Sequence, residues 1–297
     1  MKTTFLERKA SHRLVDRCYH TQMPPLTPYA EVNEILQELM KGLGAILGSE
    51  LAGVYLYGSL TTAEFDRQSD IDVLVVTRDE MSDEVFATVA AMHDKIAAGD
   101  SWCATQLEVA YIPLQALRRY DAETSVYPHL DRGKGEHLQR KEHWTDCVVQ
   151  RHVLRELGIA LAGPHPATLI DPVSDEDRRQ AMHDLLFRWG ESLFSDPSQL
   201  ERRGSQSYVV LSICRILYTL ETGAVASKRQ ASDWAKATLD ERWKLLIDRA
   251  WTGRQNPDSE ATPEDVDATL DLMRYAMGLS LYPRHPRTAG DTKTNVI

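Results

Sequence analysis

The residues whose types and spacing point most clearly to chemistry are two aspartates on one short segment, Asp70-Ile71-Asp72. This segment leads into an apolar run that ends near residue 77. Val, Leu and Ile in that run predict a strand over residues 71–77. Because alternate residues of a strand share a face, Asp70 and Asp72 project together while Ile71 points into the opposite, apolar layer. Adjacent carboxylates repel each other, and a bound Mg²⁺ offsets that repulsion. Mg²⁺ in such sites is usually coordinated by carboxylates together with phosphate oxygens of the substrate. The pair therefore predicts a magnesium site for a phosphorylated ligand such as a nucleoside triphosphate.

A second feature, Gly58-Ser59, ends a predicted strand over residues 52–56 and is separated from Asp70 by ten residues. A glycine lets the backbone approach a ligand closely, and backbone N–H groups at a helix start can hold phosphate oxygens together with the Ser59 hydroxyl. The stretch between Ser59 and Asp70 has no apolar periodicity, which indicates a loop or a short helix start. We expect this turn to contact phosphate beside the cation.

A third acid, Glu108, lies inside an apolar segment that predicts a strand over residues 106–112. Alternation places it on one face with Ala110 and Ile112. If that strand lies beside the Asp70–Asp72 strand, Glu108 completes the cluster and can accept a proton from an attacking hydroxyl as a general base. An edge strand with Glu108 facing water is the alternative that spacing alone leaves open.

The elements that must position these residues fall into two halves. Apolar residues at helical spacing predict a helix over residues 28–48, with Thr27 as its N-cap and Pro28 at its first position, and a second helix over residues 83–98. With the three strands they make a mixed α/β domain. A further helix is expected over residues 144–162, ending at the breaker Gly163-Pro164-His165-Pro166.

The second half reads as helical almost throughout, which predicts an all-α bundle. Its helices are expected at residues 176–194, 208–222, 228–237, 239–251 and 263–281. We accordingly expect an N-terminal extension over residues 1–26, an α/β domain over 27–165, a helical domain over 166–284 and a flexible tail over 285–297.

Composition narrows the classes of partner. The chain has 297 residues, 42% of them hydrophobic, and a formal charge of −10, which disfavours nucleic acid and favours cationic small molecules. Four scattered cysteines suit free thiols in a reducing compartment, so a cytoplasmic protein is expected. No stretch approaches the roughly 18 apolar residues of a membrane span, so no membrane partner is expected. Composition does not indicate an oligomeric state.

Two segments carry a family resemblance. The pattern Y-G-S-x10-D-I-D-x-L-V, starting at Tyr57, resembles the signature of the polymerase-β-like nucleotidyltransferase superfamily. Residues 207–235, SYVVLSICRILYTLETGAVASKRQASDWA, resemble the C-terminal segment of the aminoglycoside nucleotidyltransferases that adenylylate streptomycin and spectinomycin. The similarity covers most of residues 28–280. It implies a polymerase-β-like α/β domain with a mixed sheet, followed by an all-α helical bundle.

The resemblance also implies roles for particular residues. Three acids would hold metal, two Mg²⁺ in this superfamily, with Glu108 also the catalytic base: Asp70, Asp72 and Glu108. Five residues would contact the ATP co-substrate, the last two from the helical half through its phosphates: Gly58, Ser59, Ser69, Arg215 and Lys228.

The expected reaction is transfer of AMP from ATP to a hydroxyl of an aminoglycoside or aminocyclitol, with release of pyrophosphate. Family members that accept streptomycin carry an acid where this chain has Ser205, and their inter-domain tryptophan has no secure counterpart in Trp144. Spectinomycin is therefore the favoured acceptor, and no residue is assigned to it. Two alternatives stay open: a different acceptor, such as a metabolite, a protein or RNA, and an antitoxin-like or regulatory module that binds nucleotide without turnover.

Overall fold

The computed structural model describes residues 26–62, 64–144 and 146–281. The predicted tail, and the predicted N-terminal extension apart from Leu26, lie outside these residues. The described chain divides into two compact units, the first running to Pro172 and the second starting at Val173.

The first unit is built on one six-stranded sheet with the strand order β5-β4-β3-β2-β1-β6. Only β2 and β3 run parallel, and every other neighbouring pair is antiparallel. The sheet is therefore mixed, as expected. Its strands are β1 (Leu51–Leu56), β2 (Ile71–Thr77), β3 (Leu107–Pro113), β4 (Val126–Leu130), β5 (Gln139–Glu142) and β6 (Ile159–Ala162).

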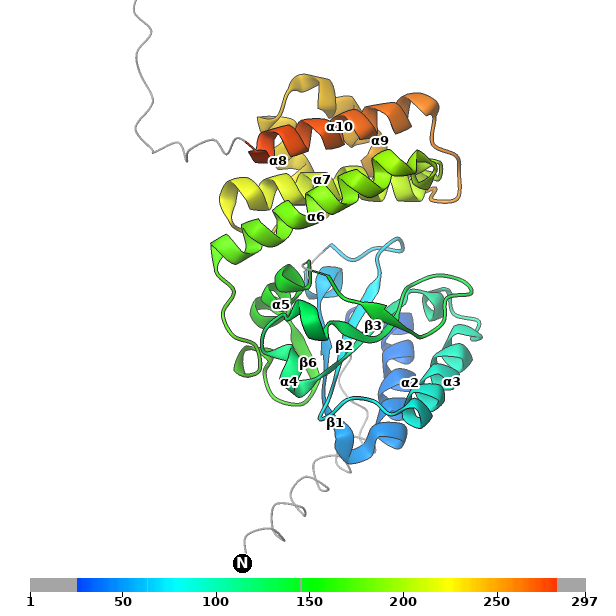
Figure 1. Ribbon diagram of the computed structural model, residues 1–297. Coiled ribbons are helices and arrows are strands. Elements are labelled where there is room, and N and C mark those ends of the chain that lie inside the picture. The colour runs from blue at the N-terminus through cyan, green and yellow to red at the C-terminus, as the bar shows by residue number, and fades with distance from the viewer. Residues whose placement is uncertain (1–25, 63, 145, 282–297) are drawn as a thin grey trace, which may run out of the picture. The chain divides into compact units, whose positions relative to one another are not determined.

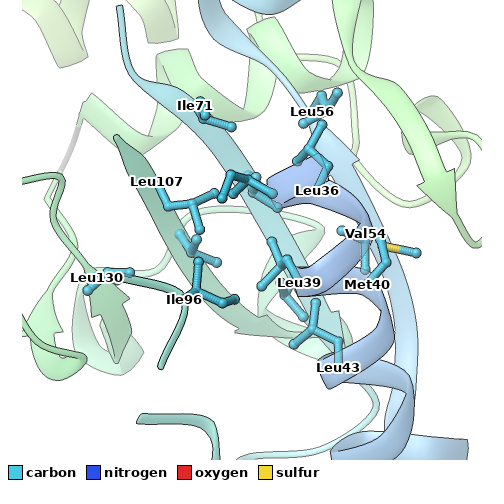
Figure 2. Close-up of a cluster of buried hydrophobic side chains, with 14 of the residues drawn as sticks. Leu36, Leu39, Met40, Leu43, Val54, Leu56, Ile71, Ile96, Leu107 and Leu130 are labelled. Atoms are coloured by element: carbon cyan, nitrogen blue, oxygen red, sulfur yellow. The ribbon is translucent and has the colours of Figure 1, made fainter. Parts of the chain in front are cut away.

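Helices cover both faces of this sheet (Figure 1). On one face lie α2 (Ala30–Leu47) and α3 (Asp83–Ala97), and on the other α4 (Leu114–Leu117) and α5 (Asp146–Leu157). Alternation along β2 sends Ile71 and Val73 to the α2 side and Leu74 to the α4 side. Figure 2 shows the side chains of α2 meeting those of the strands on the first of these faces. Burying a leucine of this kind contributes about 1.5–3 kcal/mol.

The start of α2 differs from the prediction, because the N-cap is Tyr29 and not Thr27. The side chain of Asn33 accepts a hydrogen bond from the Thr27 backbone N–H at 2.8 Å and donates one to the Thr27 carbonyl at 2.8 Å. Since Asn33 satisfies the backbone of Thr27 from inside the helix, Thr27 and Pro28 stay outside, and the helix begins at Ala30.

The predicted helix over residues 144–162 is wrong at its C-terminal end. The helix α5 ends at Leu157, and after Gly158 the chain forms β6, which pairs antiparallel with β1. The pattern of the short segment over residues 159–162 does not distinguish a strand from a helix, so the open edge of β1 decides its conformation. The short strands β4 and β5 were likewise not predicted.

The second unit is helical, as expected. Its helices are α6 (Asp175–Ser195), α7 (Arg203–Thr222), α8 (Lys228–Thr238), α9 (Lys244–Gly253) and α10 (Pro263–Leu281). The segment expected as one helix over residues 239–251 instead contains a 3₁₀ turn, Glu241–Trp243, before α9. Helix α7 packs against the other four helices, and its residues Val210, Leu211 and Ile213 are buried.

The segment before the second unit belongs to the first. Ile170 packs into the core on the α4 side of the sheet, and Asp171 pairs with Arg118 at 2.7 Å and Arg119 at 2.6 Å. These contacts explain why the compact units divide after Pro172, whereas the predicted domain boundary lies after residue 165.

Two further expectations concern cysteines and membranes. Cys103, Cys147 and Cys214 are buried free thiols, and Cys18 lies outside the described residues. Within the described part of the chain, no helix combines the length and apolar character that crossing a membrane requires.

Burial of His93 makes stability depend on pH. His93 is 2% exposed, and its Nε2 lies 2.6 Å from the Tyr111 hydroxyl. Burial lowers the pKa of His93 from 6.5 to about 4, so unfolding takes up a proton below pH 6.5. Between pH 6.5 and 4 we expect the group to remove up to about 3 kcal/mol of stability. Urea unfolding of a His93→Gln variant should show a shallower loss over this range, with no such change for exposed His165→Gln. An unchanged slope in His93→Gln would contradict this assignment.

Candidate active site

The parallel pairing of β2 with β3 brings the three predicted acids together. Asp72 is in register with Glu108, and Asp70 directly precedes β2. One carboxylate oxygen from each of Asp70, Asp72 and Glu108 lies within 4.8 Å of the others. No other group of three or more potential His, Cys, Asp or Glu ligands occurs in the described part of the chain. Glu108 thus faces the aspartates, and the edge-strand alternative is excluded by the central position of β3.

Gly58 leaves the space that Asp72 occupies. It follows β1 and begins a short 3₁₀ helix, Gly58–Thr61, and its φ of +67° lies in the left-handed region that favours glycine. A Cβ at this position would overlap the carboxylate oxygen Oδ2 of Asp72. The backbone before it is tied to the same strand, since the Tyr57 N–H donates to the Asp72 carbonyl at 3.2 Å.

The two predicted nucleotide-contacting serines differ in their hydrogen bonding. Ser59 Oγ is buried and has no hydrogen-bond partner among the described residues, so its hydroxyl can serve a ligand. The Ser69 hydroxyl donates to Asp66 Oδ1 at 3.1 Å and accepts from the Asp66 N–H at 3.0 Å. Ser69 therefore also holds the loop that leads into Asp70.

The electrostatics of the cluster centre on Glu108. Burial raises its pKa to about 7, and the negative charges of Asp70 and Asp131 add to the effect. Lys141 and Arg132 act in the opposite direction. Three hard carboxylate ligands under mutual repulsion fit a divalent cation, which would favour the ionised form of Glu108.

Two basic residues at this site were not predicted. Arg132 forms an ion pair with Asp70 and donates to the Gln68 carbonyl at 2.8 Å, and Lys141 Nζ lies 2.7 Å and 3.0 Å from the two Asp131 carboxylate oxygens. Arg132 follows β4 and Lys141 lies in β5. Because the sequence pattern identified neither strand, no signal in the sequence pointed to these side chains.

The remaining predicted residues, Arg215 and Lys228, lie in the second unit. Arg215, on α7, donates from Nε to the Ala226 carbonyl at 3.1 Å. Ala226 stands two residues before Lys228, the first residue of α8, whose Nζ lies 5.3 Å from the ring centroid of Tyr208. The connection between α7 and α8 thus ties Arg215 to the segment that carries Lys228.

Comparison with known proteins agrees with both units. Residues 32–127 match the model of a nucleotidyltransferase domain, and residues 168–277 match the C-terminal domain of aminoglycoside adenylyltransferase. A mixed sheet that carries a Gly-Ser turn and a three-carboxylate cluster is consistent with the first match. Fold and site together define a nucleotidyltransferase.

Full-length relatives narrow the class. An aminoglycoside (3'')(9) adenylyltransferase of Escherichia coli is 26% identical over 84% of this chain and 95% of its own length. A spectinomycin 9-adenylyltransferase of Staphylococcus aureus is 26% identical over 84% of this chain and 96% of its own. The chain is thus similar to aminoglycoside adenylyltransferases along most of its length, and the expected enzyme class and fold class are confirmed.

A solved structure shows the same fold. Spectinomycin adenyltransferase AAD(9) from Enterococcus faecialis, determined with ATP and spectinomycin, superimposes with a TM-score of 0.63 over 82% of this chain and 98% of that one. Its sequence identity of 17% limits the likeness to the fold.

Gly58→Ala should damage the site more than the fold. The left-handed backbone alone costs a non-glycine residue about 1–2 kcal/mol, and the added methyl group also displaces the Asp72 carboxylate. Gly48→Ala is the matched control, since Gly48 has a φ of +50° and open space around its Cβ position. We expect both variants to lose stability in urea, and only Gly58→Ala to lose Mn²⁺ binding in calorimetry. Equal Mn²⁺ binding by the two variants would contradict the role given to Gly58.

Proposed function

We propose that this enzyme transfers AMP from ATP to a hydroxyl of an aminoglycoside or aminocyclitol, with spectinomycin favoured over streptomycin. The carrying observation is the cluster of Asp70, Asp72 and Glu108 beside the Gly58-Ser59 turn. The names of the relatives support the acceptor class, and the structure that shares this fold contains ATP and spectinomycin.

The choice of spectinomycin rests on Ser205. It lies in the first turn of α7, which begins at Arg203, at the place where streptomycin-accepting members of the family carry an acid. A hydroxyl adds no negative charge, whereas streptomycin is a polycation whose guanidinium groups pair well with carboxylates. The formal charge of −10 on the chain still favours cationic over anionic acceptors.

In the proposed mechanism, Asp70, Asp72 and Glu108 would hold two Mg²⁺, whose charge would offset that of the triphosphate. The backbone of Gly58 and the hydroxyl of Ser59 would contact phosphate oxygens, and Ser69 would support the same loop. The positive charges of Arg215 and Lys228 would stabilise the negative charge that develops on the departing pyrophosphate. The helical domain would thus supply cations to a reaction that the acids of the α/β domain begin.

Glu108 is proposed as the general base. Without a bound cation, burial and the neighbouring acids raise the pKa of Glu108 to about 7, and a cation held by the same acids would keep this carboxylate ionised and able to accept a proton. The acceptor hydroxyl would pass its proton to Glu108 while its oxygen attacks the α-phosphorus, and the bond from that phosphorus to the bridging oxygen of pyrophosphate would break. The products are the adenylylated acceptor and pyrophosphate.

A panel of acceptors tests the substrate assignment. Purified protein is incubated with Mg²⁺ and ATP labelled at the α-phosphate, with spectinomycin, streptomycin or other aminoglycosides, and pyrophosphate and labelled product are measured. We expect product with spectinomycin and less or none with streptomycin, because Ser205 lacks the carboxylate. Streptomycin as the better acceptor would contradict this assignment. Nucleotide binding without product from any acceptor would favour the alternative acceptors or a non-catalytic module.

Glu108→Gln tests the proposed base. Loss of a general base typically lowers the rate by about 10²–10⁴-fold, and the neutral amide leaves the nearby phosphate contacts in place. We therefore expect this loss in kcat, with ATP affinity in calorimetry changed only several-fold. Glu142→Gln, at an exposed position on β5, is the control and should keep wild-type turnover. Full turnover by Glu108→Gln would remove Glu108 from this role.

A further inference from the structure

Arg132 lies directly on the acid cluster although it is not an acid. It follows β4 by two residues, in a loop whose Gly133 N–H donates to the Thr105 carbonyl at 2.9 Å, just before β3. Its guanidinium pairs with Asp70 and donates to the Gln68 carbonyl at 2.8 Å. The loop is thereby fixed beside the start of β3, and Arg132 bridges two positions of the segment that leads into β2.

The ion pair covers the oxygen of Asp70 that it uses. Asp70 Oδ1 is buried, and Arg132 Nη1 is its ion-pair partner. A divalent cation that approaches this oxygen meets a positive guanidinium, which must move aside or share the carboxylate. The other basic side chain near the acids, Lys141, already has a partner, because its Nζ donates to both carboxylate oxygens of Asp131.

The pair is also one that can be broken at small energetic cost. The Arg132 side chain is 37% exposed and that of Asp70 is 23% exposed, so water can replace the interaction, and such pairs contribute little to stability. A doubly charged cation interacts more strongly with three carboxylates than one guanidinium does with a single carboxylate. The arrangement therefore favours exchange of Arg132 for a divalent cation.

We propose that Arg132 is a displaceable counter-cation, which neutralises Asp70 while the cluster holds no metal and competes with the divalent cation for that carboxylate. This inference rests on the cation site of the proposed function and adds a residue that sets its affinity. While Arg132 pairs with Asp70, it reduces the repulsion among the acids, and it raises the cation concentration at which the site fills.

Cation binding to the full-length protein tests this directly, with no acceptor or nucleotide present. Mn²⁺ is titrated calorimetrically at pH 8, where Glu108 is ionised, into wild type, Arg132→Met and Arg132→Lys. We expect Arg132→Met to bind Mn²⁺ on the order of tenfold more tightly than wild type, since the competing charge is gone. Arg132→Lys should fall between the two, because a single ammonium cannot reproduce the planar fork of the guanidinium.

Arg140→Met is the matched control. Arg140 is 42% exposed and forms its ion pair with Asp83 at the start of α3, at 2.9 Å. Its replacement also removes an arginine ion pair, and we expect wild-type Mn²⁺ affinity. A gain in affinity equal to that of Arg132→Met would show an effect of net charge alone and would overturn the proposal.

Thermal unfolding supplies a second readout. Mg²⁺ should raise the melting temperature of Arg132→Met, relative to its value in EDTA, more than that of wild type, because no guanidinium competes with the cation for Asp70. Equal or weaker Mn²⁺ binding by both Arg132 variants would overturn the competition. If wild type itself binds no divalent cation, the cation site of the proposed function fails together with this inference, whereas wild-type binding without the gain overturns the inference alone.

Discussion

The active unit depends on one unfavourable interaction, the repulsion among three carboxylates held within 4.8 Å of one another. The parallel register of β2 and β3 keeps Asp72 opposite Glu108, so the side chains cannot separate without breaking the centre of the sheet. The strength of this constraint is visible in Glu108, whose pKa is raised to about 7 by burial and by neighbouring acids. Clustered carboxylates of this kind are stabilised by nearby positive charge, and residues around the site supply part of it.

Residues from several elements accommodate the three acids. Gly58 has no side chain in the space that Asp72 occupies. Arg132 forms an ion pair with Asp70, and Lys141 forms one with Asp131. Ser59 leaves a buried hydroxyl without a partner among the residues described, beside the acids and at the start of a 3₁₀ turn. These features suit an anionic ligand that arrives with divalent cations better than either component alone. Nucleotide transfer is the chemistry that unites them.

The second unit contributes a different kind of support. Its central helix α7 packs against the four other helices and carries Arg215, which is tied to the segment before Lys228. One family model matches residues 32–127 of the first unit, and the other matches residues 168–277, nearly all of them in the second. The three acids of the proposed cation site lie in the first unit, and the proposed phosphate-contacting residues Arg215 and Lys228 lie in the second.

By itself the sequence indicated the three acids, the Gly-Ser turn and the long helices, since these follow from local spacing and strong apolar periodicity. The class of enzyme came from the resemblance of two of its segments to a known family. It did not reveal β4, β5 or β6, because short strands take their conformation from the partner beside them and not from their own residues. The start of α2 differs from the prediction because Asn33 binds the backbone of Thr27 in the adjoining turn. Ile170 and Asp171 belong to the first unit because they contact residues that are distant in the chain. The same holds for Arg132 and Lys141: only tertiary structure brings a loop after β4 and a strand after that loop to the acids of β2 and β3, and charge balance at a site depends on such neighbours.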